Sequence, residues 1–231
     1  VPISTSFISA SGGTQEDYTS FTLESEVILP KRRARSDYDY FPTPFVTSSI
    51  MGFHSADPAA AQDFTWPTND YDLQVYAVSP STNGNQKSGY FLVTSSYYGT
   101  ELTSSVIENL YDNKKWNISL VVKPSKKNAD LVSGSSDTDY DVKFYAVSAY
   151  SDIIQEEIEL QDTITTDGEK LLNTSKRIYA GAHRTNFTGS VVHKSDIKLS
   201  SLRYWASELD DNVIRLHAEN SDSFGPEHPL R

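Results

Sequence analysis

Paired acidic side chains are the first residues in this sequence that could do chemistry. Two carboxyl groups on either side of a glycosidic bond can act as nucleophile and acid in sugar hydrolysis. Glu157 and Glu159 share one face of an extended segment, and so do Glu24 and Glu26 near the start of the chain. However, the sequence contains no Glu-x-Asp-x-x-Glu spacing, and alternation also produces solvated outer faces. We interpret both pairs as solvated and predict no catalytic residue.

Three aspartates at alternate positions, Asp137, Asp139 and Asp141, are the candidate metal ligands. In a strand their side chains lie about 7 Å apart from one to the next. Calcium takes six to eight oxygens at about 2.4 Å, which loops can bring together and a straight strand cannot. Calcium is therefore the one cofactor that the sequence offers. A charged turn that enters a strand is the alternative interpretation.

Aromatic side chains near turns are the candidate sugar contacts. Tyr97 and Tyr98 precede Gly99 after an apolar segment, and Trp66 lies near Tyr71 in a long irregular stretch. An aromatic ring carries a large apolar face that can stack on a sugar. We predict glycan contacts at Trp66, Tyr71, Tyr97 and Tyr98, with burial against the sheet as the alternative.

Composition excludes several other kinds of site. The chain has no cysteine, so disulfides, Cys-ligated zinc and thiol nucleophiles are all absent. No Gly-x-Ser-x-Gly, His-x-x-x-His or phosphate-loop motif occurs. The net charge of −11 repels nucleic acid and anionic membranes, and no run of 18 apolar residues is present. We expect neither a nucleic-acid partner nor membrane insertion.

Period-two alternation of apolar and polar residues is typical of half-buried strands. It occurs in the segments 19–29, 73–77, 116–122 and 140–146, and the segment 90–93 is apolar throughout. Asn83-Gly84 is a turn signal that predicts a hairpin between the segments 73–77 and 90–93. The segment 153–160 fits either a strand or a helical turn.

A helix is predicted over 208–219. Ser207 and Asp210 have the spacing of a capping box, and Leu209, Val213 and Leu216 would form an apolar stripe facing the sandwich. We also expect His217, beside this stripe, to be a packed or half-exposed structural histidine. These elements predict an all-β fold, an antiparallel two-sheet jelly-roll sandwich with one short C-terminal helix. The predicted organisation is a polar arm over 1–18, the sandwich over 19–219 and an irregular tail over 220–231.

The order of motifs in the last third resembles a known family. The segments 177–182, 186–189, 195–198 and 202–205 follow one another before the helix, with 20–24 and 115–120 upstream. This order resembles concanavalin A-like jelly-roll domains of the laminin-G and pentraxin type. It is also similar in style to modules of large phage virion and tail proteins. The resemblance implies a β-sandwich and, in some relatives, bound calcium.

These observations lead to three hypotheses. The first is a non-enzymatic structural or adhesive module of a larger assembly, a phage virion or tail, that contacts other structural subunits and host glycans. It implies a virion or extracellular location. Because the first residue is Val, we also expect a processed chain or a piece of a longer one. The second is a stand-alone calcium-assisted lectin-like domain, and the least favoured is a polysaccharide hydrolase.

Overall fold

The chain forms mostly strands. The computed structural model describes residues 20–31, 47–56, 70–79, 87–125, 139–168, 170–186 and 189–220. The elements in these ranges are β1 (Phe21–Ile28), β2 (Thr47–Ala56), β3 (Asp70–Val78), β4 (Tyr90–Thr94), β5 (Glu101–Thr103), β6 (Lys115–Pro124), β7 (Tyr140–Tyr150), β8 (Ile153–Ile164), α1 (Lys170–Asn173), β9 (Ser175–Ala180), β10 (Ala182–Arg184), β11 (Val191–Lys194), β12 (Lys198–Trp205) and α2 (Asp211–Glu219).

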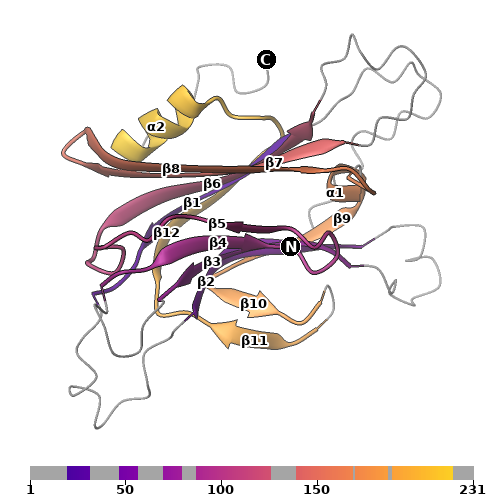
Figure 1. Cartoon of the computed structure of the whole chain (residues 1–231), viewed down its shortest axis with the longest axis horizontal. Coiled ribbons are helices and arrows are strands. Elements are labelled where there is room, and N and C mark those ends of the chain that lie inside the picture. The colour runs from indigo at the N-terminus through magenta and orange to yellow at the C-terminus, as the bar shows by residue number, and fades with distance from the viewer. Residues whose placement is uncertain are drawn as a thin grey trace.

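Two five-stranded antiparallel sheets pack face to face (Figure 1). The first sheet has the order β12-β1-β6-β7-β8, and we call it the helix-side sheet because α2 lies over its outer face. The second has the order β5-β4-β3-β2-β9. We call it the hairpin-side sheet because the β10–β11 hairpin lies beyond its outer face, next to β2. The predicted all-β sandwich with a short C-terminal helix is confirmed.

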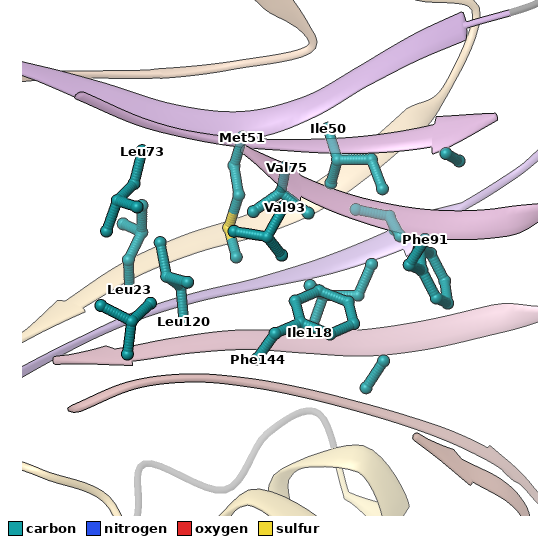
Figure 2. Packing of buried hydrophobic residues seen from close by; sticks show 14 of the residues in the cluster. Leu23, Ile50, Met51, Leu73, Val75, Phe91, Val93, Ile118, Leu120 and Phe144 are labelled. Atoms are coloured by element: carbon teal, nitrogen blue, oxygen red, sulfur yellow. The ribbon is translucent and has the colours of Figure 1, made fainter. Parts of the chain in front are cut away.

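Apolar side chains from both sheets meet in one core (Figure 2). The inward positions of the central strands are apolar, so alternation places these side chains between the sheets. Aromatic rings join the two layers. Phe21 of β1 lies edge-on to Phe53 of β2 at 5.6 Å, and Phe91 of β4 contacts Trp116 of β6 at 5.3 Å. Burial of this surface, at about 25 cal/mol per Å², is the main force holding the layers together.

The structure confirms the predicted strands and adds others that the alternation pattern did not predict, among them β2 and β5. β3 and β4 pair as the predicted hairpin, and the ambiguous segment 153–160 belongs to β8. The longest of the unpredicted strands is β2, in which a register shift between Ser49 and Met51 interrupts the pairing with β3. Such an irregularity puts Ile50 and Met51 together in the core and removes the period-two pattern.

The prediction for the C-terminal helix is wrong in two details. The helix begins at Asp211, and its N-cap is Asp210, whose carboxylate accepts a hydrogen bond from the Asn212 backbone N–H at 2.9 Å. Because Leu209 precedes the helix, its spacing to later residues is not helical. The buried face is formed by Ile214, His217 and Ala218 instead, and Leu216 is 56% exposed.

Some predictions lie outside the described residues. The arm over 1–18 and nearly all of the tail over 220–231 belong to this group, so the predicted domain boundaries remain predictions. Within the described ranges, neither helix has the length and apolar character needed to cross a membrane.

A fully buried lysine lies at one end of the core. Lys176 of β9 donates hydrogen bonds from Nζ to the carbonyl oxygens of Leu172, at 3.3 Å, and Thr174, at 3.0 Å. The same nitrogen lies 5.4 Å from the centre of the Phe21 ring. Burial lowers the pKa of Lys176 from 10.5 to about 7. The folded chain therefore releases a proton that the unfolded chain retains between pH 7 and pH 10.5.

We predict that Lys176 makes the stability of this protein rise with pH. Between about pH 7 and pH 10 the unfolded state binds one more proton at this residue, so unfolding becomes harder as pH increases. The free energy of unfolding of the wild type, minus that of Lys176→Met, should rise by up to about 1.4 kcal/mol per pH unit. Urea denaturation at pH 6, 7.5 and 9 measures it. A difference that stays constant with pH would contradict the prediction.

Candidate functional site

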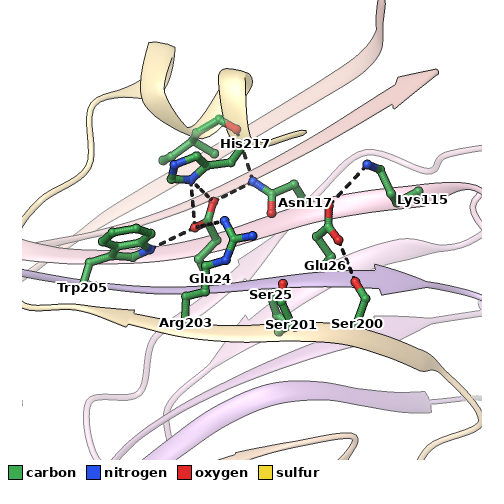
Figure 3. A network of polar contacts seen from close by, with 11 residues as sticks. Glu24, Ser25, Glu26, Lys115, Asn117, Ser200, Ser201, Arg203, Trp205 and His217 are labelled. Carbon is green, nitrogen blue, oxygen red and sulfur yellow. Dashed lines mark hydrogen bonds and ion pairs between the residues drawn. The ribbon is translucent and has the colours of Figure 1, made fainter. Parts of the chain in front are cut away.

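The outer face of the helix-side sheet carries a buried carboxylate (Figure 3). Glu24 of β1 is 1% exposed, and its two oxygens lie 2.9 and 3.0 Å from Nδ1 of His217 on α2. Asn117 Nδ2 of β6 donates to Glu24 at 2.7 Å, and Trp205 Nε1 of β12 donates at 2.9 Å. One carboxylate therefore joins four elements that are far apart in the sequence.

This network keeps its charge despite burial. Burial alone would raise the pKa of Glu24, but the hydrogen bonds from His217, Asn117 and Trp205 hold that pKa below its usual value of 4.5. Arg203 NH1 adds a cation at 3.9 Å, and the His217 ring stacks on Trp205 with 5.4 Å between centroids. Glu24 is therefore an ionised acceptor at neutral pH. It has no proton to give to a substrate.

The expectation that Glu24 and Glu26 form a solvated face is wrong. Glu26 is 6% exposed, lies 3.3 Å from Lys115 Nζ and accepts a hydrogen bond from Ser200 Oγ at 2.7 Å. Besides the β6 partners, the groups that cover these carboxylates come from β12 and α2, more than 170 residues further along the chain. Period-two alternation assigns the two carboxylates to the outer face correctly, but it contains no information about what covers that face. The sequence predicts a packed or half-exposed His217, and the structure shows that it is packed, with 1% of the residue exposed.

The outer face of the hairpin-side sheet carries a second cluster, centred on His54 of β2. His54 Nδ1 lies 2.7 Å from Asp70 Oδ2, and Nε2 lies 3.1 Å from the carbonyl oxygen of Arg184 in β10. Both ring nitrogens thus face oxygen atoms. The second contact ties the β10–β11 hairpin to the sheet.

Gln74 of β3 connects the members of this second cluster. Its amide nitrogen donates to Asp72 Oδ2 at 3.3 Å, and its amide oxygen lies 3.0 Å from His183 Nδ1 on the hairpin. The Tyr179 hydroxyl of β9 lies 3.4 Å from the same His183 nitrogen. Gly52 of β2 pairs with both Gln74 and Tyr179, so it leaves the space in which these two side chains converge.

Asp72 uses its other oxygen to hold the turn between β4 and β5. Asp72 Oδ1 accepts hydrogen bonds from the backbone N–H groups of Ser96, at 3.0 Å, and Tyr97, at 3.3 Å, and from Ser95 Oγ at 3.3 Å. Burial raises the pKa of Asp72 above its usual value. Both Asp72 oxygens are thus occupied by groups of the protein itself, and this carboxylate is a structural acceptor.

Three of the four predicted sugar contacts lie together at this turn. Tyr71 is buried and lies edge-on to Tyr97 at 4.6 Å, and Tyr97 lies 5.0 Å from Tyr98. Both turn tyrosines are tethered to Asp167: Tyr97 donates to its carboxylate at 2.6 Å and Tyr98 to its carbonyl oxygen at 3.0 Å. Trp66 lies outside the described residues. Glycan contact at these positions stays a prediction.

The predicted metal ligands are only partly described. Asp137 lies outside the described residues. Asp141 Oδ1 accepts hydrogen bonds from Ser125 Oγ at 2.7 Å and Thr163 Oγ1 at 2.8 Å, and the Asp139 carbonyl oxygen accepts one from the Ser125 N–H at 3.0 Å. In the described part of the chain, no three His, Asp or Glu residues are placed to hold one ion. Calcium binding stays a prediction for this segment.

Glu157 of β8 has a structural partner. Arg215 of α2 donates to both of its oxygens, from Nε at 2.7 Å and from NH2 at 3.0 Å. The hydrogen bond from Arg215 lowers the pKa of Glu157. A glycosidase acid needs a carboxyl group whose pKa is raised. Arg215 therefore makes Glu157 unsuited to that role, and Glu159 beside it is exposed.

Comparison with known proteins adds no family to this picture. The sequence matches no model of a known protein family, and a comparison with curated proteins gives no significant match.

We predict that Gly52→Ala damages the hairpin-side cluster. A methyl group at this position would lie 2.6 Å from the Leu73 carbonyl oxygen and 2.8 Å from both Gln74 Oε1 and the Tyr179 hydroxyl. Because the first of these atoms belongs to the backbone, relaxation requires a strand to shift. We expect a loss of about 1–3 kcal/mol in the free energy of unfolding, measured by urea denaturation.

Gly99→Ala is the control for this substitution. A methyl group at Gly99 would meet no atom within 4 Å, although Gly99 has a φ of +66°. That variant tests backbone strain without crowding. The backbone strain alone costs about 1 kcal/mol. A smaller loss for Gly52→Ala than for Gly99→Ala would contradict the crowding argument.

Proposed function

We propose that this chain is a non-enzymatic structural or adhesive β-sandwich module of a larger assembly, such as a phage virion or tail. The observation that carries the proposal is the state of the buried acids. Glu24 and Asp72 have their oxygens occupied by donors from the protein itself. These groups hold elements in place instead of facing a substrate.

The geometry of the sandwich supports a role in presenting surfaces. α2 is attached to the outer face of the helix-side sheet, and the β10–β11 hairpin is attached to the outer face of the hairpin-side sheet. Each sheet is therefore held by a further element on its outer side. Two large apolar side chains project from the turn between β7 and β8. Tyr150 is 77% exposed and Ile153 is 62% exposed. Ser151 and Asp152 between them have φ values of 50° and 60°, an uncommon conformation for residues other than glycine.

Exposed apolar residues on a rigid hairpin favour contact with a partner. Positive φ at both central residues is typical of a two-residue hairpin turn, which places Tyr150 and Ile153 side by side at the end of the hairpin. The partners that fit the proposal are neighbouring structural subunits and host glycans, and the location that fits is a virion or an extracellular surface. The two antiparallel five-stranded sheets also support membership in the concanavalin A-like jelly-roll class, which is part of this proposal.

We predict that the β7–β8 turn is needed for assembly. In the virus or cell that encodes the chain, gradient-purified particles should contain it, as measured by quantitative peptide mass spectrometry. A double variant, Tyr150→Asp with Ile153→Asp, should reduce its amount in particles by about tenfold or more, the effect of losing a contact worth about 1.4 kcal/mol. Gln155→Asp, an exposed change on the same hairpin, is the control.

Two results would count against this proposal. One is a wild-type chain found entirely outside particles. The other is release of reducing sugar from β-glucans by the purified chain, because that would require a catalytic pair of carboxyl groups.

A glycan-binding role is the second candidate, favoured by the convergence of Tyr71, Tyr97 and Tyr98. We predict that a glycan array shows binding that Tyr97→Ala reduces by about fivefold or more, the effect of losing about 1 kcal/mol. Tyr90→Ala, at the start of β4 and outside this cluster, is the control. Repeating the array with a chelator separates calcium-dependent binding from stacking alone, and an array with no binding in either condition removes this candidate.

A further inference from the structure

The contact between α2 and the helix-side sheet depends on carboxylates. Glu24 on β1 faces His217 of α2, and Glu157 on β8 faces Arg215 of α2. The same pattern continues at the start of the helix, where Asp211 pairs with Lys143 of β7. Glu208, three residues before the helix, pairs with Lys123 of β6 at 2.6 Å. Four acid–base pairs therefore hold α2 and the segment leading into it.

The core between the two sheets has a different chemistry. Its side chains are apolar and come from both sheets (Figure 2). Acid does not change the charge of these side chains, because they have none, and Lys176 at the end of the core already takes up its proton near pH 7. The apolar part of the α2 contact is much smaller, with Ile214, Ala218 and Leu209 packed on Val121, Tyr145 and Val147. Acid therefore weakens the α2 contact without directly weakening the inter-sheet core.

We propose that α2 is a latch that acid releases while the sandwich stays folded. The released helix would uncover the apolar outer face formed by Val121, Tyr145 and Val147, together with the partly buried Ile154. The proposal concerns the response of this contact to pH and holds whether or not the chain belongs to a virion.

The direction of the pH effect follows from the paired acids. The folded chain holds the pKa values of Glu24 and Glu157 below the usual 4.5. A carboxyl group with a lowered pKa contributes stability that is present above its unfolded value and is lost as pH falls through its folded value. The latch is therefore closed at neutral pH and opens below about pH 4.5.

Other charged groups around the latch act in the same direction. The strands beneath and beside α2 carry these charged or titratable side chains: Glu26 on β1, Lys115 and Lys123 on β6, Lys143 and Tyr145 on β7, Glu156 and Glu157 on β8, and Arg203 on β12. The helix and its cap carry Asp210, Asp211, Arg215, His217 and Glu219. When the carboxylates take up protons, the lysine and arginine side chains keep their charges. Unbalanced positive charges then face one another across the contact and favour its opening.

The absence of cysteine allows a direct test. Ala218→Cys places one thiol in the α2 contact, where Ala218 is 1% exposed, and Ala146→Cys places one in the inter-sheet core, where Ala146 is 0% exposed. Each variant is mixed with 4,4′-dithiodipyridine, which reacts with thiols in acid, and the labelling rate is measured from pH 7 to pH 3. Far-UV circular dichroism follows the strands in parallel.

We expect the two thiols to respond differently. Labelling at position 218 should rise below pH 4.5, by up to about tenfold per pH unit for each carboxyl group that gains a proton on opening. Labelling at position 146 should stay slow while the strand signal persists. Simultaneous exposure of both thiols, or protection of position 218 until the strands are lost, would overturn the proposal. Val213→Cys serves as the reporter if Ala218→Cys does not fold.

A matched pair on β8 isolates the contribution of one acid. Glu157→Gln in the Ala218→Cys background should raise labelling at pH 6 by about two- to fivefold, the effect of losing an exposed ion pair of roughly 0.4–1 kcal/mol. It should also reduce the steepness of the pH dependence. Glu159→Gln removes the same charge from an exposed neighbour and should change neither quantity. Equal effects of the two variants would show that overall charge, and not the Arg215 contact, controls the helix.

Discussion

A carboxylate removed from water must be hydrogen-bonded, and in this protein that requirement determines how the ends of the described chain come together. Glu24 lies in the first strand, and its donors lie in β6, β12 and α2. Leaving any of these donors out would leave a buried charge with too few partners, at a cost of several kcal/mol. The network therefore specifies where β12 and α2 must lie, in addition to stabilising them.

On the hairpin-side sheet, the buried polar groups are hydrogen-bonded by neutral side chains as well as by charged ones. Gln74 donates to Asp72 and accepts at His183, so one amide links the sheet to the hairpin that covers it. Asp72 in turn holds the turn that carries Tyr97 and Tyr98. Both sheets thus have apolar inner faces and outer faces on which polar groups attach a further element. The fold has four layers, of which the inner two form by apolar burial and the outer two attach through polar contacts (Figure 1).

The inner layers could be predicted from the sequence, because they follow from alternation within single strands. Leu73, Val75 and Ala77 face the core as the pattern indicates. β2 was missed because its bulge puts Ile50 beside Met51 and hides the period. The burial of Glu24 could not be predicted, because the groups that cover it are determined by tertiary packing. The one available signal was His217, a histidine beside an apolar helix face, which marks a helix that contacts something polar.

The two outer contacts differ in their response to conditions. The link through Gln74 uses an amide, which carries no charge. The contact of α2 depends on carboxyl groups, which gain and lose protons as the pH changes. The hairpin-side contact also includes the ionisable side chains of Asp72 and His183, so acid can affect both covers, but the α2 contact is the one that is held mainly by paired acids. If a large assembly contains this chain, the face beneath α2 is the surface that release of the helix would expose. The stability of that face also does not depend on the apolar core, so it can change without loss of the fold.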